Sequence, residues 1–315
     1  MKTKDLGEFV AREAGKVISG QEDILESILV SFLAGGHVLL EGVPGIAKTL
    51  MARTISHVLN LGFNRIQFTP DLMPSDITGT YVYDMRSSEF KLKKGPVFTE
   101  FLLADEINRT PPKTQSALLQ AMEERQVTFD GVDHDLGGRF FVIATQNPVE
   151  YEGTYPLPEA QLDRFLLKAL VNYPTLSEEH EVVKRSHMGF DPHSLDAVGL
   201  QKIGSPDEID AAKVEILGVR VEDPVLEYAV SIVRRTREMH NILLGGSPRA
   251  SLALIKCSKV VAALVGRDYV TPDDIKQIAP AVLRHRLILS PETLVEGVTP
   301  DQVIAGVLAA IQVPR

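Results

Sequence analysis

A glycine-rich turn between a short apolar strand and a helix constrains this chain more than any other feature. The apolar run Val38-Leu-Leu-Glu41 predicts a buried strand, and helical spacing predicts a helix from about Thr49 to Leu59. The residues between them read Gly42-Val-Pro-Gly-Ile-Ala-Lys48-Thr49. Glycines let backbone N–H groups converge on phosphate oxygens, and the helix N-terminus adds positive potential. The segment therefore predicts a phosphate-binding loop within an α/β fold.

The residues of this turn have distinct expected tasks. Lys48 is expected to reach the outer phosphates of a nucleotide, and the Thr49 hydroxyl is expected to hold Mg²⁺. Ala47 stands where such loops usually have glycine, and we expect the extra methyl group to be tolerated if φ is negative there. The alternative is a glycine turn that joins a strand to a helix by chance. The expected nucleotide-binding residues are Gly42, Val43, Pro44, Gly45, Ile46, Ala47, Lys48, Thr49 and Leu50.

An apolar strand that ends in two acids supplies a second signal. The run Phe101 to Ala104 is followed by Asp105 and Glu106. An acid at a strand end can bind Mg²⁺, and its neighbour can polarise an attacking water. We therefore expect Asp105 to share the metal with Thr49, and Glu106 to act on water. An isolated Asp-Glu pair is more often a solvated strand end, so the prediction depends on the lysine-threonine turn that precedes it.

Three further polar residues are candidates for the same site. Asn147 follows the fourth predicted strand, where its amide would lie near the γ-phosphate, although Asn-Pro alone indicates an ordinary turn. Arg164 ends a short predicted helix, and its alternative is a surface ion pair with Asp163 or Glu159. Arg249 opens a helix, where the helix dipole disfavours a cation. It is therefore a candidate for contact with an anion.

The pattern of elements changes along the chain. Residues 1–172 alternate helical patterns with short apolar runs, whereas residues 173–315 show helical patterns only. Short buried strands separated by helices require crossover connections and therefore a parallel sheet. The join Val171-Asn-Tyr-Pro-Thr-Leu is typical of a linker. The further predicted strands are Arg65 to Phe68, Phe140 to Ala144 and Phe165 to Val171.

Composition excludes several classes of protein. The single cysteine, Cys257, allows no internal disulfide and favours a cytoplasmic protein. No run approaches the roughly 18 apolar residues of a membrane span, and the eight histidines have no metal-site spacing. The formal net charge of −9 disfavours a general affinity for nucleic acid.

Together these motifs resemble those of AAA+ ATPases, and within that group the MoxR family. The resemblance rests on Leu40-Glu-Gly-Val-Pro-Gly-Ile-Ala-Lys-Thr49, Leu103-Ala-Asp-Glu-Ile-Asn-Arg109 and Ser247-Pro-Arg-Ala250, and it covers nearly the whole chain. An alanine in the phosphate loop is usual in this family. The resemblance implies a three-layer αβα domain with a five-stranded parallel sheet over residues 1–172, and an all-α lid domain over residues 173–315.

The resemblance also implies an activity and an assembly. It implies an enzyme that hydrolyses ATP with Mg²⁺, in a ring of identical subunits that is usually a hexamer, with ATP between subunits. The lid of relatives can be displaced, so Arg249 could act on its own subunit's ATP or on a neighbour's. The implied roles are the Walker B pair at Asp105 and Glu106, sensor 1 at Asn147, the arginine finger at Arg164, sensor 2 at Arg249, and the adenine-packing segment at Val17 and Ile18.

Two insertions fit the same group. Residues 81–98 lengthen the connection before the third strand and resemble the helix-2 insert. Residues 127–141 predict a β-hairpin with an Asp130-Gly131 turn and resemble the hairpin before sensor 1. Both would point toward the central pore of a ring, where related machines touch their substrates. The alternative for each is a surface loop without a role.

The charges of these insertions bear on the substrate. Related motors of the MCM type move on DNA with basic hairpins, whereas here the hairpin reads Asp130-Gly-Val-Asp-His-Asp135, whose carboxylates would repel phosphates. The other insertion does contain Lys91, Lys93 and Lys94, although lysine clusters are usually solvated surface. We therefore favour a protein substrate over nucleic acid.

The resemblance implies chaperone-like maturation of a partner complex, often metal-dependent, whose components often include a von Willebrand factor A domain. Three alternatives stay open at this point. One is a chelatase motor subunit that drives metal insertion into a tetrapyrrole. The others are a nucleic-acid motor and a scaffold that binds ATP with little turnover. The sequence does not distinguish the chelatase hypothesis from the chaperone hypothesis, because the ATP-hydrolysing machinery is shared and only the partner differs.

Overall fold

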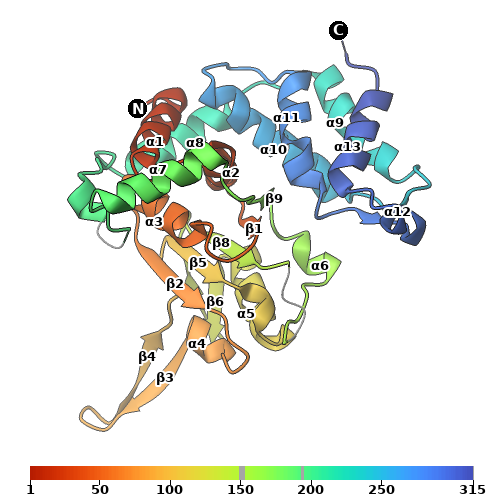
Figure 1. The fold of residues 1–315 in the computed structure, drawn as a ribbon. Coiled ribbons are helices and arrows are strands. Elements are labelled where there is room, and N and C mark those ends of the chain that lie inside the picture. The colour runs from red at the N-terminus through yellow and green to blue at the C-terminus, as the bar shows by residue number, and fades with distance from the viewer. Residues whose placement is uncertain (149–152, 193–194, 315) are drawn as a thin grey trace.

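The structure is a computed structural model of the 315-residue chain, and it describes residues 1–148, 153–192 and 195–314. A five-stranded parallel sheet lies at its centre, with strands in the order β2-β5-β8-β1-β9 (Figure 1). This confirms the predicted parallel sheet. Its strands are β1 (Val38–Glu41), β2 (Phe63–Gln67), β5 (Phe101–Asp105), β8 (Phe141–Gln146) and β9 (Leu167–Leu170).

The strand boundaries differ from the predicted ones by one to two residues. Strand β2 begins two residues early because Phe63 and Asn64 also pair with β5. Strand β9 begins late because Leu166 instead donates its N–H to the carbonyl of His37, just before β1. Pairing with a neighbour, which the local pattern does not contain, sets these ends.

Helices cover both faces of the sheet, so its central strands are buried throughout. Alternate residues of β5 point to opposite faces: Phe101 and Leu103 belong to one hydrophobic core, and Leu102 and Ala104 belong to the other. This is the three-layer αβα arrangement. The first core includes α1 (Thr3–Gly15), α2 (Glu22–Leu33) and α3 (Lys48–Val58), and the second includes α4 (Pro74–Thr78) and α5 (Pro112–Glu124).

Two antiparallel hairpins extend the second core. In the β6–β7 hairpin the Asp130-Gly131 turn has φ values of 47° and 79°, the left-handed pair that a tight hairpin turn requires. Phe129 of this hairpin packs on Tyr81 of the other, with ring centroids 6.3 Å apart. The hairpin strands are β3 (Gly79–Asp84), β4 (Glu89–Lys94), β6 (Gln126–Phe129) and β7 (Val132–Asp135). Figure 1 shows β3 and β4 projecting away from the body of the protein.

The C-terminal part is helical, as predicted, with one addition. Strands β10 (Ile242–Leu244) and β11 (Ile288–Leu289) form a two-stranded antiparallel ribbon. The sequence did not indicate it because strands of three and two residues are too short to show a period. The helices are α7 (Leu176–His187), α8 (Asp207–Leu217), α9 (Asp223–Thr236), α10 (Pro248–Leu264), α11 (Pro272–Leu283), α12 (Pro291–Val295) and α13 (Pro300–Ala310).

Proline and capping residues fix where these helices start. Each helix from α9 to α13 has proline in its first turn, where the missing N–H has no cost. Thr271 caps α11 in a capping box with Asp274. The shorter elements are the helix α6 (Glu159–Leu162) and the 3₁₀ turns at Ile107–Arg109 and Leu195–Val198.

One hydrophobic core joins the two parts of the chain. The cluster that contains Leu6 and Val10 of α1 also contains Leu254 and Val261 of α10. The C-terminal helices therefore pack beside α1 and α2 (Figure 1). Among the described residues, no helix combines the length and apolar character that crossing a membrane requires.

A buried histidine links the edge of this core to the sheet. His37 is 5% exposed; its Nε2 lies 3.0 Å from the carbonyl oxygen of Met122, and its Nδ1 lies 3.0 Å from the N–H of Val142. Val142 donates to Nδ1, so Nε2 carries the proton that is donated to Met122. Both bonds need the neutral ring, and burial lowers the pKa of His37 to about 4.

This pKa predicts a loss of stability in mild acid. In the unfolded chain His37 takes up a proton near its ordinary pKa, whereas the folded protein resists protonation until about pH 4. Its contribution is therefore intact above about pH 6.5 and falls by up to ~3 kcal/mol as the pH drops toward 4. Urea unfolding of the wild type and His37→Gln at pH 7 and pH 4.5 measures this. The stability gap between them should narrow in acid; a constant gap would contradict the assignment.

Candidate functional site

The predicted phosphate loop is a tight turn between β1 and α3. Gly42 has no room for a side chain, because an added Cβ would lie 2.4 Å from the carbonyl oxygen of Val171. Gly45 has a φ of +84°, a conformation that glycine adopts without strain. Lys48 is 8% exposed, and its Nζ donates to the carbonyl oxygen of Gly42 at 2.5 Å. Burial lowers the pKa of Lys48, while Asp105 and other nearby carboxylates act in the opposite direction.

Ala47 does not meet the condition of a negative φ under which its methyl group was expected to be tolerated. Its φ is +61°, in the left-handed region, directly before the first residue of α3. A non-glycine residue there costs roughly 1–2 kcal/mol. Gln21 and Glu106, with φ values of 69° and 58°, are also left-handed, and both line pockets that contain Ala47 or its neighbours. Three of the seven left-handed non-glycine residues among the described part of the chain therefore lie around this site, where such strain is common if function depends on the geometry.

The two predicted acids are fixed by a hydroxyl group from the next strand. Thr145 of β8 donates its hydroxyl to Oδ1 of Asp105 at 2.6 Å, and the Thr145 hydroxyl oxygen accepts the N–H of Glu106 at 2.8 Å. Thr145 is fully buried. The sequence reasoning missed it, although a polar residue directly after the apolar run Phe141-Val-Ile-Ala144 was the available signal.

The residues proposed for Mg²⁺ face each other across the site. The Thr49 hydroxyl lies 3.4 Å from Oδ2 of Asp105. A hydroxyl and a carboxylate are hard oxygen ligands that suit Mg²⁺, which usually takes few protein ligands and completes its shell with water and phosphate oxygens. No cluster of three or more His, Cys, Asp or Glu side chains that could hold a metal occurs among the described residues. The donor set therefore fits a metal that arrives with a nucleotide.

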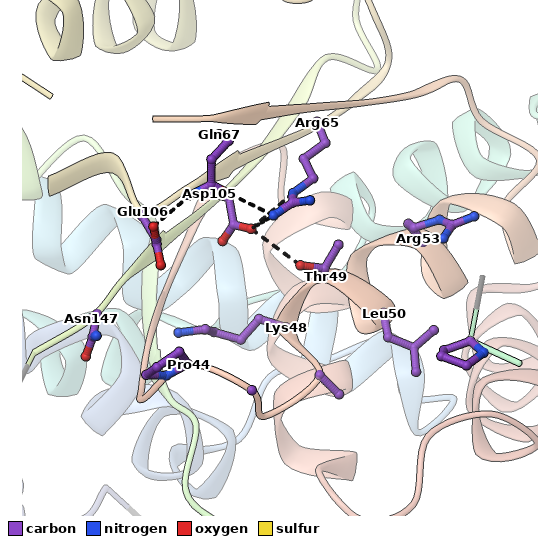
Figure 2. Close-up of a pocket in the computed structure, with 13 residues that line it drawn as sticks. Pro44, Lys48, Thr49, Leu50, Arg53, Arg65, Gln67, Asp105, Glu106 and Asn147 are labelled. Carbon is purple, nitrogen blue, oxygen red and sulfur yellow. Dashed lines mark hydrogen bonds and ion pairs between the residues drawn. The ribbon is translucent and has the colours of Figure 1, made fainter. Parts of the chain in front are cut away.

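Two residues of β2 reach the acids from the other side, and the sequence reasoning missed both. Arg65 donates from Nη2 and Nε to Oδ2 of Asp105, at 2.7 and 3.1 Å. Gln67 donates to Oε2 of Glu106 at 2.7 Å (Figure 2). Residues two apart on a strand point to the same face, so the polar pair on a predicted strand was the usable signal. Glu106 also pairs with Arg109 at 3.2 Å.

These side chains line one pocket. Asn147 is 4% exposed and lines it from the end of β8. In Figure 2 the Lys48 ammonium group points toward the side of the pocket where Asn147 lies. The structure therefore brings together five predicted polar residues, Lys48, Thr49, Asp105, Glu106 and Asn147, with Pro44, Gly45, Ala47 and Leu50 of the predicted loop.

A second pocket adjoins the phosphate loop and is largely apolar. Val17 and Ile18 line it, together with Ile46, Ala47 and Leu50, as the adenine-packing prediction requires. Its outer wall was not predicted and comes from Tyr173, Val182, Val183 and Phe190, in or beside α7. An apolar slot next to a polar phosphate loop suits the base of a nucleotide.

Arg164 and Arg249 line neither of these pockets. They lie together in a third, where both pair with Glu123 of α5. Arg164 lies 3.1 Å from Oε2 of Glu123, and Arg249 lies 2.9 Å from Oε1. The alternative ion pair of Arg164 with Asp163 is wrong, because Asp163 instead accepts from Arg286 at 2.7 Å.

Comparison with known proteins agrees with this geometry. Residues 37–167 match the ATPase family associated with various cellular activities (AAA), and residues 234–307 match the AAA lid domain. An uncharacterised Bacillus subtilis protein, YeaC, is 48% identical over 95% of this chain and 92% of its own length. The chaperone MoxR1 of Mycobacterium tuberculosis is 44% identical over 96% of this chain and 81% of its own.

A solved structure shows the same fold. A crystallised candidate ATPase from Cytophaga hutchinsonii superposes with a TM-score of 0.91 at 42% identity, covering 99% of this chain and 96% of that one. The sheet, the phosphate loop and the acid pair thus define an AAA+ ATPase with a helical lid. Its relatives place it more narrowly: the chain belongs to the MoxR family, as the sequence motifs indicated.

The position of Thr145 generates a testable prediction. Thr145→Val keeps the shape but leaves the Glu106 N–H without this partner and removes the hydrogen bond that Oδ1 of Asp105 accepts. We expect ATP turnover to fall about 10- to 100-fold and the Mg²⁺ concentration for half-maximal activity to rise. Steady-state ATPase assays across a Mg²⁺ series measure both quantities. Thr145→Ser, which keeps the hydroxyl, is the matched control; equal activity of the two variants would contradict this role.

Proposed function

We propose that this ATPase acts in a ring of identical subunits, which we expect to be a hexamer, and hydrolyses Mg·ATP at sites shared by neighbouring subunits. The energy of hydrolysis drives chaperone-like remodelling of partner proteins. The observation that carries this proposal is the location of Arg164 and Arg249. Two arginines with the expected roles of finger and sensor 2 lie together, outside the pocket of their own subunit.

Within one subunit, the chain's own residues divide the chemistry as follows. Lys48 neutralises charge on the outer phosphates, and Thr49 and Asp105 would hold a Mg²⁺ ion, which would supply further positive charge there. Glu106 accepts a proton from the attacking water, and Asn147 contacts the γ-phosphate. In the structure Gln67 and Arg109 both contact Oε2 of Glu106, and these contacts orient its carboxylate in the pocket.

The neighbour's arginines complete the site. As phosphoryl transfer proceeds, charge is spread over the γ-phosphate oxygens, and cations placed there lower the barrier. Arg164 and Arg249 are 31% and 57% exposed, so a second subunit can reach both. We therefore assign Arg249 to act on a neighbour's ATP, together with Arg164, rather than on its own subunit's.

The lid domain in this proposal begins at residue 173, and the nucleotide-binding domain is residues 1–172. Thr175 caps α7 in a capping box with Glu178, so a new helix starts just after Pro174. Helix α7 belongs to the lid and lines the apolar pocket. The position of the lid would therefore depend on whether a nucleotide base fills this pocket. The single cysteine, Cys257, is buried, which is consistent with the cytoplasmic location that we also propose.

The β3–β4 hairpin supports a protein client rather than nucleic acid. Its outer part exposes Met85 and Phe90, at 87% and 70%. Two of its lysines are engaged within the subunit: Lys91 pairs with Asp84 at 2.6 Å, and Lys94 lies over the Phe98 ring. Exposed apolar side chains at a projecting tip suit contact with polypeptide.

A relative supports the class of role that we propose, but not the identity of the client. MoxR1 is named as a chaperone, and we propose the same class of role for this chain. We propose that its client is a partner complex with a von Willebrand factor A domain and a metal cofactor. A chelatase motor would use the same ATP site. It is distinguished by stimulation of turnover by a tetrapyrrole-binding partner instead of a protein client.

A shared site predicts that specific activity depends on protein concentration. ATP turnover per subunit should rise as subunits assemble, and Arg164→Ala should lower it by about 10³-fold or more while ATP binding is retained. Steady-state assays over a wide concentration range, with fluorescent ATP binding in parallel, measure this. Arg220→Ala, which removes an exposed arginine paired with Asp268, is the control.

Two outcomes would count against the proposal. Flat specific activity together with a harmless Arg164→Ala would exclude a shared site. Absence of turnover at every concentration, with and without a protein partner, would favour a scaffold that binds ATP without using it.

A further inference from the structure

A single carboxylate joins the two arginines of the exposed pocket. Glu123 gives one oxygen to each guanidinium, with Arg249 at 2.9 Å from Oε1 and Arg164 at 3.1 Å from Oε2. Arg249 comes from the N-terminal turn of α10, 126 residues along the chain. Glu123 therefore bridges the lid helix and the segment that follows α6.

The backbone of Glu123 is held firmly by the packing of α5, although its side chain is accessible. It lies in the last turn of α5, which Leu118, Leu119 and Met122 anchor in the second core. Arg164 also donates from Nη1 to the carbonyl oxygen of Leu119, one turn earlier on the same helix, at 2.9 Å. Helix α5 thus binds both Nη1 and Nη2 of the Arg164 guanidinium.

The lid holds the same segment from its other side. Arg286 is 8% exposed and donates to Oδ1 of Asp163 at 2.7 Å and to the carbonyl oxygen of Phe165 at 2.7 Å. Ser247, the residue before α10, lies 3.2 Å from the other oxygen of Asp163. The residues on both sides of Arg164 are therefore attached to the lid that also bears Arg249.

Electrostatics explains why an acid is needed between the arginines. Two guanidinium groups that converge on one point repel each other, and Lys256 in the same pocket adds to the positive potential. A carboxylate placed between them offsets this repulsion and leaves the trio with a net charge of about +1. Each carboxylate oxygen takes one guanidinium, an arrangement that two oxygens of a phosphate group can also accept.

We infer that Glu123 is a positioning residue that holds Arg164 and Arg249 as a pair, so that both meet the γ-phosphate of the neighbouring subunit together. This inference rests on the shared site of the proposed function. Glu123 touches no reacting atom; it acts through the two arginines. Its removal leaves each arginine in place on the chain but no longer directed to a common point.

The test compares Glu123→Gln with Glu124→Gln. Both remove one negative charge from the same turn of α5, but the hydrogen bonds that the Glu124 carboxylate accepts come from Gln120 of its own helix. We expect Glu123→Gln to lower kcat about tenfold, with KM for ATP within about twofold of wild type, since misplaced groups cost rate more than binding. Glu124→Gln should turn over ATP like the wild type.

A second measurement separates positioning from a structural role. Glu123→Gln is combined with Arg164→Ala and Arg249→Ala, and residual hydrolysis is followed under single-turnover conditions. If Glu123 acts through the arginines, its change has no further effect in that background. A further loss of rate there, or a Glu123→Gln variant as fast as Glu124→Gln, would overturn the inference.

The same set of variants distinguishes the inference from the proposal beneath it. If Arg164→Ala and Arg249→Ala leave turnover unchanged, the shared site fails, and the positioning role fails with it. If both arginine variants slow turnover and Glu123→Gln does not, the shared site survives, and only the role of Glu123 is overturned.

Discussion

The order of the sheet, with β8 between β1 and β5, is the constraint on which the site depends. In a parallel sheet the carboxyl ends of adjacent strands meet at one edge. This edge brings together the phosphate loop after β1, the acids at the end of β5, and Asn147 after β8. The Thr145 hydroxyl, on the neighbouring strand β8, forms hydrogen bonds with the Asp105 carboxylate and the Glu106 N–H and so fixes the positions of both acids. The polar side chains at this edge, such as Asp105 and Asn147, are held in place because the strands that carry them are buried in the core.

Much of this could be predicted from sequence, because local patterns encode it. Glycine at a strand–helix junction, acids at a strand end and Thr271 before a proline each report a local backbone state. Asp105 and Lys48 were found in this way. The contributions of Arg65, Gln67 and Thr145 depend on which strands are neighbours, and strand order is absent from local pattern. The partner of Arg164 was missed for the same reason, since Glu123 lies on a helix 41 residues earlier.

Ala47 shows a different limit. Its residue type suggests a relaxed helical start, yet the loop imposes φ of +61°. The turn needs a left-handed residue before Lys48, and packing behind α3 supplies the energy to hold one. Propensity describes what a residue prefers, whereas α3 is also held by Met51 and Ile55, which are fully buried in the core.

We propose that one ATP-hydrolysing site is formed by residues from two copies of the chain. Mixing two inactive variants tests this division most directly. Lys48→Ala subunits lack a working phosphate loop but keep Arg164, whereas Arg164→Ala subunits have the opposite defect. We predict that the mixture hydrolyses ATP well above the sum of the two variants measured separately, because some interfaces then combine two intact halves. A mixture no more active than that sum would contradict a shared site and, with it, the central claim.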